Sequence, residues 1–311
     1  MSDTPQQAPG SPPLWVVTGP TASGKTALAL ELAARTGREI LSMDSMAVYR
    51  RMDIGTAKPT DAERARVPHH LVDLVEPSET FDTARWCKLA EERLAALRDR
   101  GKQALFVGGT PLYLMAFFKG MMEGPEADPE LRRRLEERER EAPGTLHEEL
   151  SARDPDAADR IHRKDTRRLV RALEVLELTG QTISSQQEQF EQAGWQRDCR
   201  VVWITRDRDE LHARVKARTE QMLDAGLVEE TRAIRDDGGF SRTAGAAIGY
   251  AECLDHLRGR WKDRTELRNR IRRNTHKLIR RQTTWLRRLP EIVRMSPEAG
   301  VDGLHARLEG C

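Results

Sequence analysis

Short apolar runs and helical patterns alternate over the first part of the chain. Three of the runs have the length and composition of buried strands, at 14–17, 39–43 and 104–107. A helical pattern begins at Thr26, and a second covers 82–100, where Gly101 provides a C-terminal stop. Alternating strands and helices are typical of a parallel sheet that is covered by helices. The pattern therefore predicts an α/β fold.

This alternation stops near Gly120. From Asp128 to about Gln192 the pattern is helical only, and strand character returns at 201–204. Two helices of this stretch begin with an Asp-Pro pair, in which Asp can cap the helix and Pro suits its first turn, at 128–129 and 154–155. We therefore predict an all-helical insert in the α/β core. The expected boundaries are a disordered tail at 1–13, a discontinuous core at 14–120 and 198–311, and the insert at 121–197.

Composition narrows the class of protein. The 311 residues carry 52 Lys and Arg against 50 Asp and Glu, a net charge of +2, so no global positive field points to nucleic acid. The longest apolar stretch, 104–118, is broken by Gly108-Gly109 and is too short to span a bilayer. The N-terminus has no apolar leader, and the cysteines show no CxxC spacing. We expect a cytoplasmic protein with reduced thiols and no membrane contact.

One motif carries specific chemistry. Residues 19–26 fit GxxxxGK[ST] in full, between a predicted strand and a predicted helix. In such a P-loop the backbone N–H groups fold around phosphates, the helix N-terminus adds a positive dipole, and the lysine adds a charge. The final hydroxyl, on Thr26, can ligate Mg²⁺. We therefore predict a P-loop-type parallel sheet core with a di- or triphosphate site, formed by Gly19, Pro20, Thr21, Ala22, Ser23, Gly24, Lys25 and Thr26.

The surroundings of this motif differ from those of a usual nucleoside triphosphatase or kinase. In these enzymes an acidic residue that ends another strand helps to hold Mg²⁺. Here the strand at 104–107 is followed by Gly108-Gly109-Thr110, without a carboxylate, and the nearest acidic residue after a strand is Asp44. Such an aspartate can act as a base, or it can simply close a turn by accepting backbone N–H bonds. The absence of a carboxylate directly after the strand at 104–107 is a first indication of a reaction other than hydrolysis.

Several sequence blocks resemble the bacterial tRNA dimethylallyltransferases. They follow in order along nearly the whole chain, from Leu14 to about Leu289. MDIGTAKP at 52–59, in a chain that also holds the P-loop, is the most specific of them. The other blocks are LSMDS at 41–45, PHHL at 68–71, VGGTPLY at 107–113, RLVRALE at 168–174, IGY at 248–250 and RQTTW at 281–285.

This resemblance implies a prenyl transfer. The exocyclic amine of the adenosine 3′-adjacent to the tRNA anticodon attacks dimethylallyl pyrophosphate, and the P-loop with Mg²⁺ stabilises the pyrophosphate that leaves. Asp44 is implied as the general base, Thr110 as a hydrogen-bonding partner near the bridging oxygen, and Arg218 as a clamp on the pyrophosphate. Thr110 can also cap a helix before Pro111, and Arg218 can belong to a solvated basic helix. The resemblance further suggests a monomer.

Two local basic zones can bind tRNA phosphates despite the neutral total. One lies at 160–171, and the other runs from Arg258 to Arg288, where thirteen Lys or Arg residues stand against Asp263 and Glu266. The resemblance assigns tRNA contact to Asp44, Ser45, Met46, Ala47, Thr110, Arg132, Arg167, Arg168, Leu169, Val170, Arg171, Ala247, Ile248, Gly249, Tyr250, Arg281 and Gln282. Family members often carry Arg or Gln where this chain has Ala246-Ala247. Trp285 is expected to pack in the core rather than to stack on a base.

Three alternatives stay open at this point. A small-molecule or nucleotide kinase would use the P-loop for ATP but has no use for a basic helical insert. Prenyl transfer to free AMP would use the same donor with a smaller acceptor. A non-catalytic RNA-binding protein could retain the P-loop as a structural element only.

Overall fold

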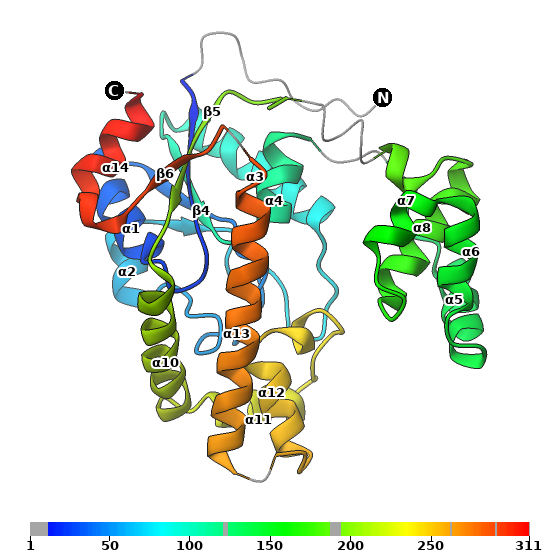
Figure 1. Cartoon of the computed structure of the whole chain (residues 1–311). Helices are drawn as coiled ribbons and strands as arrows, with labels where there is room; N and C mark the ends of the chain where they lie inside the picture. Colours follow the sequence, from blue (N-terminus) through cyan, green and yellow to red (C-terminus); the bar gives the residue numbers. More distant parts are fainter. Residues whose placement is uncertain (1–11, 121–123, 187–193, 262, 290, 311) are drawn as a thin grey trace. The chain divides into compact units, whose positions relative to one another are not determined.

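The computed structural model describes residues 12–120, 124–186, 194–261, 263–289 and 291–310. The described parts of 1–118 and 197–311 form one compact unit, here called the core unit, and those of 119–196 form a second, here called the helical unit (Figure 1). All but the last two residues of the expected tail at 1–13 lie outside the described residues.

A six-stranded sheet forms the centre of the core unit, and all of its strand pairs are parallel. Its strands are β1 (Leu14–Thr18), β2 (Glu39–Ser42), β3 (His69–His70), β4 (Ala104–Gly108), β5 (Cys199–Ile204) and β6 (Val293–Met295). They lie in the order β3-β2-β4-β1-β5-β6, which places β1 between β4 and β5. The α/β class and the four expected strands are confirmed. β3 and β6 were not predicted, because runs of two and three residues show no recognisable period.

Helices cover both faces of this sheet (Figure 1). The described α-helices of the core unit are α1 (Lys25–Thr36), α2 (Asp61–Arg66), α3 (Thr83–Asp99), α4 (Pro111–Phe118), α10 (Arg208–Asp224), α11 (Leu227–Asp236), α12 (Tyr250–Leu257), α13 (Arg264–Leu286) and α14 (Gly300–Glu309). The helices predicted from Thr26 and over 82–100 correspond to α1 and α3, and both predictions are confirmed.

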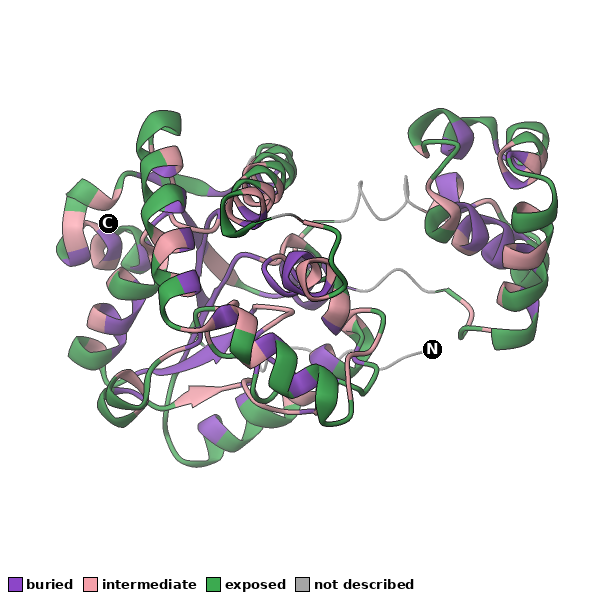
Figure 2. Cartoon of the chain, turned by 90° about the horizontal axis from the view of Figure 1, so that it is seen from below, coloured by how far each residue is buried: buried purple, intermediate pink, exposed green. Residues whose placement is uncertain are grey.

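Alternate side chains of the strands serve the two faces, as the period of a strand requires. Leu105 and Val107 of β4 belong to a core that α1 and α14 complete. Phe106, between them, contacts Phe117 and Phe118 of α4 instead, at ring-centroid distances of 5.2 and 5.1 Å. β1, β2 and β4 are buried along their whole length, and β5 is buried except for its first two residues. Buried strands are purple in Figure 2.

The parallel arrangement decides where the functional loops lie. The carboxyl ends of parallel strands meet at one edge of a sheet, which is where open α/β sheets bind ligands. The P-loop follows β1, the turn with Asp44 follows β2, and Gly109-Thr110 follows β4. Because β2, β4 and β1 are neighbours, these three loops converge although their sequences are far apart.

The helical unit contains α5 (Pro129–Glu141), α6 (Thr145–Arg153), α7 (Pro155–Arg160) and α8 (Thr166–Thr179). Asp128 caps α5 and Asp154 caps α7, each with a proline in the first turn, so both Asp-Pro predictions are confirmed. Leucines of α5, α6 and α8 form its apolar centre, drawn purple in Figure 2. This unit therefore has a core of its own.

Candidate active site

The P-loop, residues 19–26, joins β1 to α1 through an unusual backbone conformation. Gly24 has a φ of 90° and Ala22 a φ of 66°, in the left-handed region that suits glycine and is uncommon for alanine. Gly24 is the N-cap of α1, so no cap side chain occupies the first N–H groups of this helix. These donors and the positive end of the helix dipole are available to an anion. The predicted phosphate cradle thus has the required local geometry.

Two arginines hold the P-loop from outside through its carbonyl oxygens. Arg206 Nε donates to the Ser23 oxygen at 2.8 Å, and Arg214 Nε donates to the Ala22 oxygen at 2.8 Å. In a trans peptide the N–H points away from the C=O, so the Gly24 N–H points away from Arg206. These contacts could not be predicted from the sequence, because Arg206 and Arg214 lie more than 180 residues from the loop.

Lys25 and Arg218 both reach this loop. Lys25 Nζ donates to the Pro20 oxygen at 3.3 Å, and Arg218 of α10 donates to Thr21 Oγ1 at 3.1 Å. Burial lowers the pKa of Lys25 to about 8, while the charge of Asp44 raises this pKa and that of Arg218 lowers it. Burial also lowers the pKa of Arg218, and Asp44 opposes that shift. Two desolvated cations and one carboxylate therefore share a site that favours a polyanion.

Hydrogen bonds join the turn after β2 to the loop after β4. Thr110 Oγ1 accepts from the Ser45 N–H at 3.0 Å, and the Thr110 N–H donates to the Met43 oxygen at 3.2 Å. Oδ1 of Asp44 accepts from the Met46 N–H at 2.8 Å, which orients the carboxylate. In the part of the chain that the structure describes, Oδ2 of Asp44 has no hydrogen-bond donor. That oxygen can accept a proton.

Thr26 is exposed in the first turn of α1, next to Lys25. Across the described ranges there is no group of three or more His, Cys, Asp or Glu side chains that could hold a metal by itself. Mg²⁺ usually keeps several waters and takes few protein ligands beside substrate phosphates. A single hydroxyl at the cradle fits such an ion and would not fit a metal that needs a complete protein shell.

Tyr250 and Glu230 hold the MDIGTAKP block at 52–59. Tyr250 Oη accepts from the Gly55 N–H at 3.1 Å and donates to Glu230 at 2.5 Å, while Glu230 also accepts from the Ile54 N–H at 3.1 Å. A Cβ atom on Gly55 would lie 2.4 Å from the Tyr250 ring, so only glycine allows this approach. Tyr250 is fully buried. The buried ring of Tyr250 packs against the backbone of the MDIGTAKP block. Contact between Tyr250 and tRNA stays a prediction.

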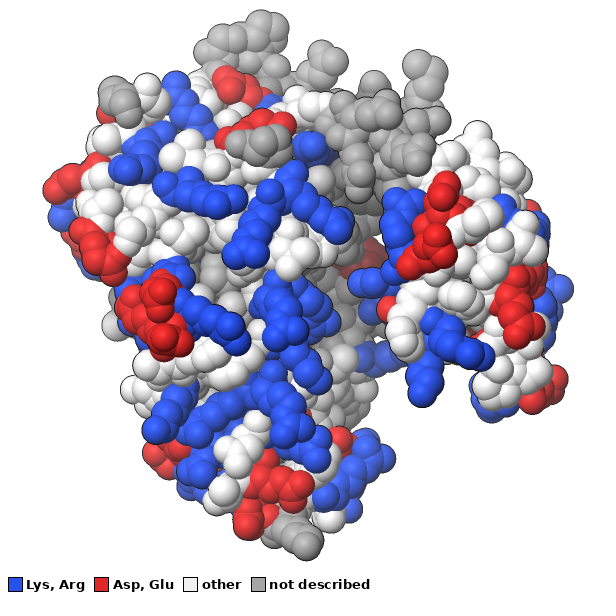
Figure 3. Space-filling model, viewed as in Figure 1, with Lys and Arg blue, Asp and Glu red and all other residues white. Residues whose placement is uncertain are grey.

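The other residues of the core unit for which tRNA contact was predicted differ in exposure. Ser45, Met46 and Ile248 are partly exposed, Arg281 is exposed, and the buried ones are Ala47, Ala247, Gly249 and Gln282. Lys and Arg gather on the face along which α13 runs, as the blue side chains in Figure 3 show. The expectation that Trp285 packs in the core is wrong, because 43% of its surface is exposed. The buried side of α13 includes Gln282 and Leu286. Trp285 lies on the solvent side of the helix.

In the helical unit the predicted residues of α8 fall into two groups. Arg167 and Arg168 are exposed, whereas Leu169 and Val170 are buried in the core of the unit. Residues at successive helix positions point in different directions, so a contiguous block cannot all face one partner. Within residues 167–171, tertiary packing thus turns Arg167 and Arg168 toward solvent and Leu169 and Val170 into the core of the unit.

A buried carboxylate, Glu174, pairs with the remaining two arginines. Arg132 contacts both of its oxygens, at 2.7 and 2.8 Å, and Arg171 contacts Oε2 at 2.6 Å. Burial alone would raise the pKa of Glu174, but the hydrogen bonds from Arg132 and Arg171 outweigh it and lower this pKa. The side chains of Arg132 and Arg171 keep 40% and 36% exposure, so each can also face a partner.

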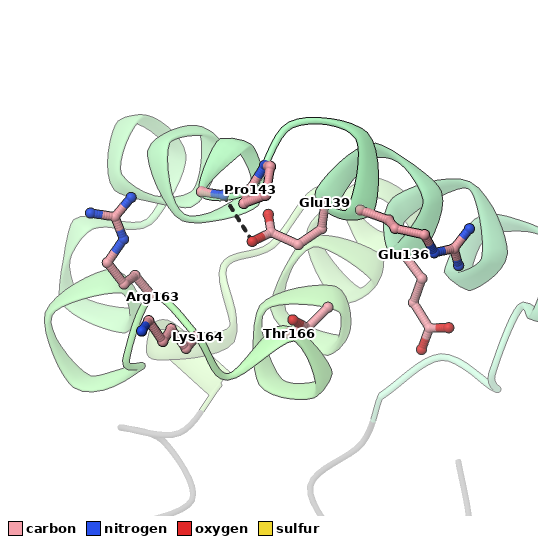
Figure 4. Close-up of a pocket in the computed structure, with 8 residues that line it drawn as sticks. Glu136, Glu139, Pro143, Arg163, Lys164 and Thr166 are labelled. Atoms are coloured by element: carbon pink, nitrogen blue, oxygen red, sulfur yellow. Dashed lines mark hydrogen bonds between the residues drawn. The ribbon is translucent and has the colours of Figure 1, made fainter.

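A hollow of about 470 Å³ lies on the helical unit (Figure 4). Arg163 and Lys164 line one side of it and Glu136 the opposite side. Glu139 Oε1 accepts from the Gly144 N–H at 2.9 Å, and Oε2 accepts from the Leu146 N–H at 3.1 Å. The carboxylate of Glu139 therefore occupies the N–H groups at the start of α6. The hollow is lined by both acidic and basic side chains. Its basic side belongs to the segment 160–171, in which Arg163 and Lys164 are exposed.

No helix within the described ranges is long and apolar enough to cross a membrane. The described cysteines, Cys87, Cys199 and Cys253, are free thiols. Burial raises the pKa of each to about 12, so these thiols stay protonated and unreactive at neutral pH.

Comparison with known proteins yields one consistent group. A family model described as IPP transferase matches residues 47–289, and one described as isopentenyl transferase matches 12–72. A tRNA dimethylallyltransferase of Geobacter metallireducens is 45% identical over 90% of this chain and 91% of the relative. Another, of Anaeromyxobacter dehalogenans, is 45% identical over 95% of this chain and 99% of the relative.

Solved structures give the same result. A tRNA isopentenylpyrophosphate transferase of Bacillus halodurans matches with a TM-score of 0.69 and 34% identity, over 96% of this chain and 97% of that one. A eukaryotic dimethylallyltransferase acting on tRNA matches with a TM-score of 0.75 and 25% identity, over 92% of this chain and 74% of that one. With its P-loop, its fold and these similarities, the chain belongs to the IPP transferase family, whose members here are named tRNA dimethylallyltransferases.

Proposed function

We propose that the protein transfers the dimethylallyl group of dimethylallyl pyrophosphate to the exocyclic amine of the adenosine 3′-adjacent to the anticodon in tRNA, and releases pyrophosphate. One observation carries the proposal: the turn with Asp44 is hydrogen-bonded to the loop after β4, and Gln282 joins that loop to the P-loop with Lys25, so carboxylate and P-loop lie at one edge of the sheet. A base for an amine and a cradle for pyrophosphate thus occur in one site. The names of the relatives support tRNA as the acceptor.

On the donor side, negative charge grows on the pyrophosphate as the bond between C1 and the bridging oxygen breaks. Lys25, Arg218 and the N–H groups at the start of α1 would meet this charge, and such preorganised donors are usually the largest contribution to catalysis. Mg²⁺ held by Thr26 and by phosphate oxygens would supply further neutralisation. Thr110, fixed to the turn with Asp44, would hydrogen-bond near the bridging oxygen.

On the acceptor side, the adenine nitrogen forms the new bond to C1 and loses one proton. The oriented carboxylate of Asp44 would accept that proton, a contribution of roughly 10²- to 10⁴-fold in rate. The nitrogen attacks carbon directly, so the reaction needs no covalent intermediate with the protein. The leaving pyrophosphate takes both electrons of the broken bond.

The acceptor requires a surface for RNA. An adenine inside a loop must leave its stack before its amine can enter a pocket. Exposed basic residues of α13, such as Arg281, and of α8, such as Arg167 and Arg168, would bind backbone phosphates and make affinity depend on salt. We expect the enzyme to act on tRNA in the cytoplasm, as a monomer.

The kinase alternative is disfavoured by the end of β4. Gly108, Gly109 and Thr110 supply no carboxylate there, whereas kinases and other P-loop enzymes use one to hold Mg²⁺. Transfer to free AMP leaves the basic face of α13 and the exposed arginines of the helical unit without a role. A protein that only binds RNA would have no need for a carboxylate beside Lys25.

The test is mass spectrometry of nucleosides from an anticodon stem-loop RNA incubated with the full chain, dimethylallyl pyrophosphate and Mg²⁺. We expect adenosine to gain one dimethylallyl unit. Parallel reactions with labelled ATP and with AMP as competing acceptor separate the alternatives, and sedimentation gives the oligomeric state. Phosphoryl transfer from ATP with unaltered RNA would refute the proposal.

A further inference from the structure

Gln282 occupies an apolar position of α13. The buried residues of this helix are Leu267, Ile271, Ile279, Gln282 and Leu286, a row with steps of three, four or eight positions that faces the interior of the core unit. Gln282 is the polar member of this row, and only 7% of its surface is exposed. A buried amide is costly unless its hydrogen bonds are made. The contacts of this amide therefore indicate why the chain carries it.

The amide joins two loops of the site. Its Oε1 accepts from the Thr21 N–H of the P-loop at 3.0 Å, and its Nε2 donates to the Gly109 oxygen at 2.6 Å. An N–H can only donate and a carbonyl can only accept, so the partners fix the orientation of the amide. Gln282 contacts both loops through their backbones, and so it acts through other groups rather than on substrate.

The two loops that Gln282 joins carry the proposed chemistry. Gly109 directly precedes Thr110, and Thr21 is the residue whose hydroxyl receives Arg218. A Cβ atom on Gly109 would lie 2.7 Å from Gln282 Nε2, so glycine permits the close approach of this amide. One side chain thus bridges the pyrophosphate cradle and the loop with Thr110, beyond the ends of the paired strands β1 and β4.

We propose that Gln282 is a positioning residue that holds the P-loop and the Gly109-Thr110 loop in register for prenyl transfer, rather than a residue that contacts tRNA. The inference rests on the proposed function and adds a component to its active site. Misplacement of reacting groups by about 1 Å can cost roughly 100-fold in rate, so loss of this link acts on the chemical step.

Two substitutions test it. Gln282→Met has a similar length and removes both hydrogen bonds, while Gln282→Glu keeps the size, keeps an acceptor for Thr21 and removes the donor to Gly109. The matched control is Gln103→Met, the same change at an exposed site before β4. The measurements are kcat, the KM values for donor and RNA, the affinity for inorganic pyrophosphate with Mg²⁺, and the melting temperature.

We expect both Gln282 variants to lose about 10- to 100-fold in kcat at saturating RNA, with the KM for RNA unchanged and weaker binding of pyrophosphate. The control should match the unaltered protein. A lower melting temperature with unchanged kcat below the transition would show a purely structural role and overturn the inference. A raised KM for RNA with unchanged kcat would show an RNA contact and overturn it as well. If Gln282→Met does not fold, the same measurements on the isosteric Gln282→Glu decide whether Gln282 is a positioning residue.

Failure of this inference can be told apart from failure of the proposed function. If the unaltered protein transfers no prenyl group, the proposed function falls. Pyrophosphate affinity requires no turnover, so it still decides the role of Gln282. Equal pyrophosphate affinity in Gln282→Met, Gln103→Met and the unaltered protein would then refute the link between α13 and the cradle.

Discussion

Thr110 Oγ1 accepts a hydrogen bond from the Ser45 N–H at 3.0 Å, which fixes the loop after β4 to the turn after β2. Asp44 directly precedes Ser45. Gly109 directly precedes Thr110, and Gln282 bonds both the Gly109 oxygen and the Thr21 N–H of the P-loop. The proposed base, the Thr110 hydroxyl and the P-loop are therefore connected by hydrogen bonds between neighbouring loops of one sheet edge. The predictions below follow from this connection and from the charges around it.

Asp44→Asn should abolish most of the transfer while RNA binding is retained. The amide keeps an oxygen for the Met46 N–H but cannot accept the amine proton, so we expect a loss of about 10²- to 10⁴-fold in kcat. Single-turnover kinetics with the stem-loop RNA measures this. The control is Asp61→Asn in the first turn of α2, an exposed site. Equal rates for Asp44→Asn and the control would exclude Asp44 as the base.

Thr110→Val should cost more than Thr110→Ser. Valine has the shape of threonine but leaves the Ser45 N–H without its acceptor, which destabilises by about 1–3 kcal/mol when a donor is left unpaired. Serine keeps the oxygen and should retain both stability and most of the activity. Denaturant unfolding and kcat are measured on the same samples. If the two variants behave alike, the hydroxyl has no part in holding the turn.

The binding of pyrophosphate should depend on pH through Lys25. The pKa of this lysine is lowered to about 8, so in the free site its charge is lost as pH rises through 8. A bound anion favours the charged form and raises the pKa. Affinity should therefore fall above pH 8, and binding there should take up a proton.

Calorimetry in two buffers of different ionisation enthalpy measures that proton uptake. Pyrophosphate can itself gain or lose protons on binding. The proton uptake measured with Lys25→Met is therefore subtracted from that of the unaltered protein. Identical proton uptake in the variant and the unaltered protein at pH 8–9 would assign the uptake to the ligand alone and contradict the lowered pKa of Lys25.

Glu174 should make the helical unit sensitive to acid. Its pKa in the folded protein lies below its ordinary value of 4.5, since the bonds from Arg132 and Arg171 outweigh the effect of burial. A carboxylate with a lowered pKa contributes stability above the unfolded pKa, and this contribution is lost as pH falls from about 4.5 through the folded value. Unfolding monitored between pH 6 and pH 3 should show this loss.

Glu174→Gln supplies the comparison. Glutamine cannot form the charged pairs, so the variant should be less stable near neutral pH and should lose less stability on acidification. The matched control is Glu177→Gln, an exposed position of the same helix, α8. If Glu174→Gln keeps the full acid sensitivity of the unaltered protein, other carboxylates are responsible.

Local signals in the sequence predicted the parts of the fold that local physics controls. The caps at Asp128 and Asp154 depend on residues within three positions, and both helices begin where the Asp-Pro pairs place them. The four longer strands were recognisable as apolar runs. The strand at 293–295 was not, because three residues carry too little pattern and its place is set by pairing with β5.

The burial of individual residues required the tertiary structure. Leu169 and Val170 stand in one sequence block with Arg167 and Arg168, yet they enter the core of the helical unit while the arginines face solvent. Trp285, expected inside, is exposed, and its neighbour Leu286 is buried instead. Helix rotation against a neighbouring element decides such cases, and sequence spacing alone does not define it when apolar and basic residues are mixed.

The P-loop after the first strand could be predicted from the sequence alone, because the motif is contiguous and its geometry depends on eight consecutive residues. The side chains that surround this loop became known only from the three-dimensional structure. Gln282 reaches Thr21 across 261 residues and Arg218 reaches it across 197. Contacts of this kind depend on how strands and helices pack in three dimensions, and no local pattern of residues encodes a partner at such a distance.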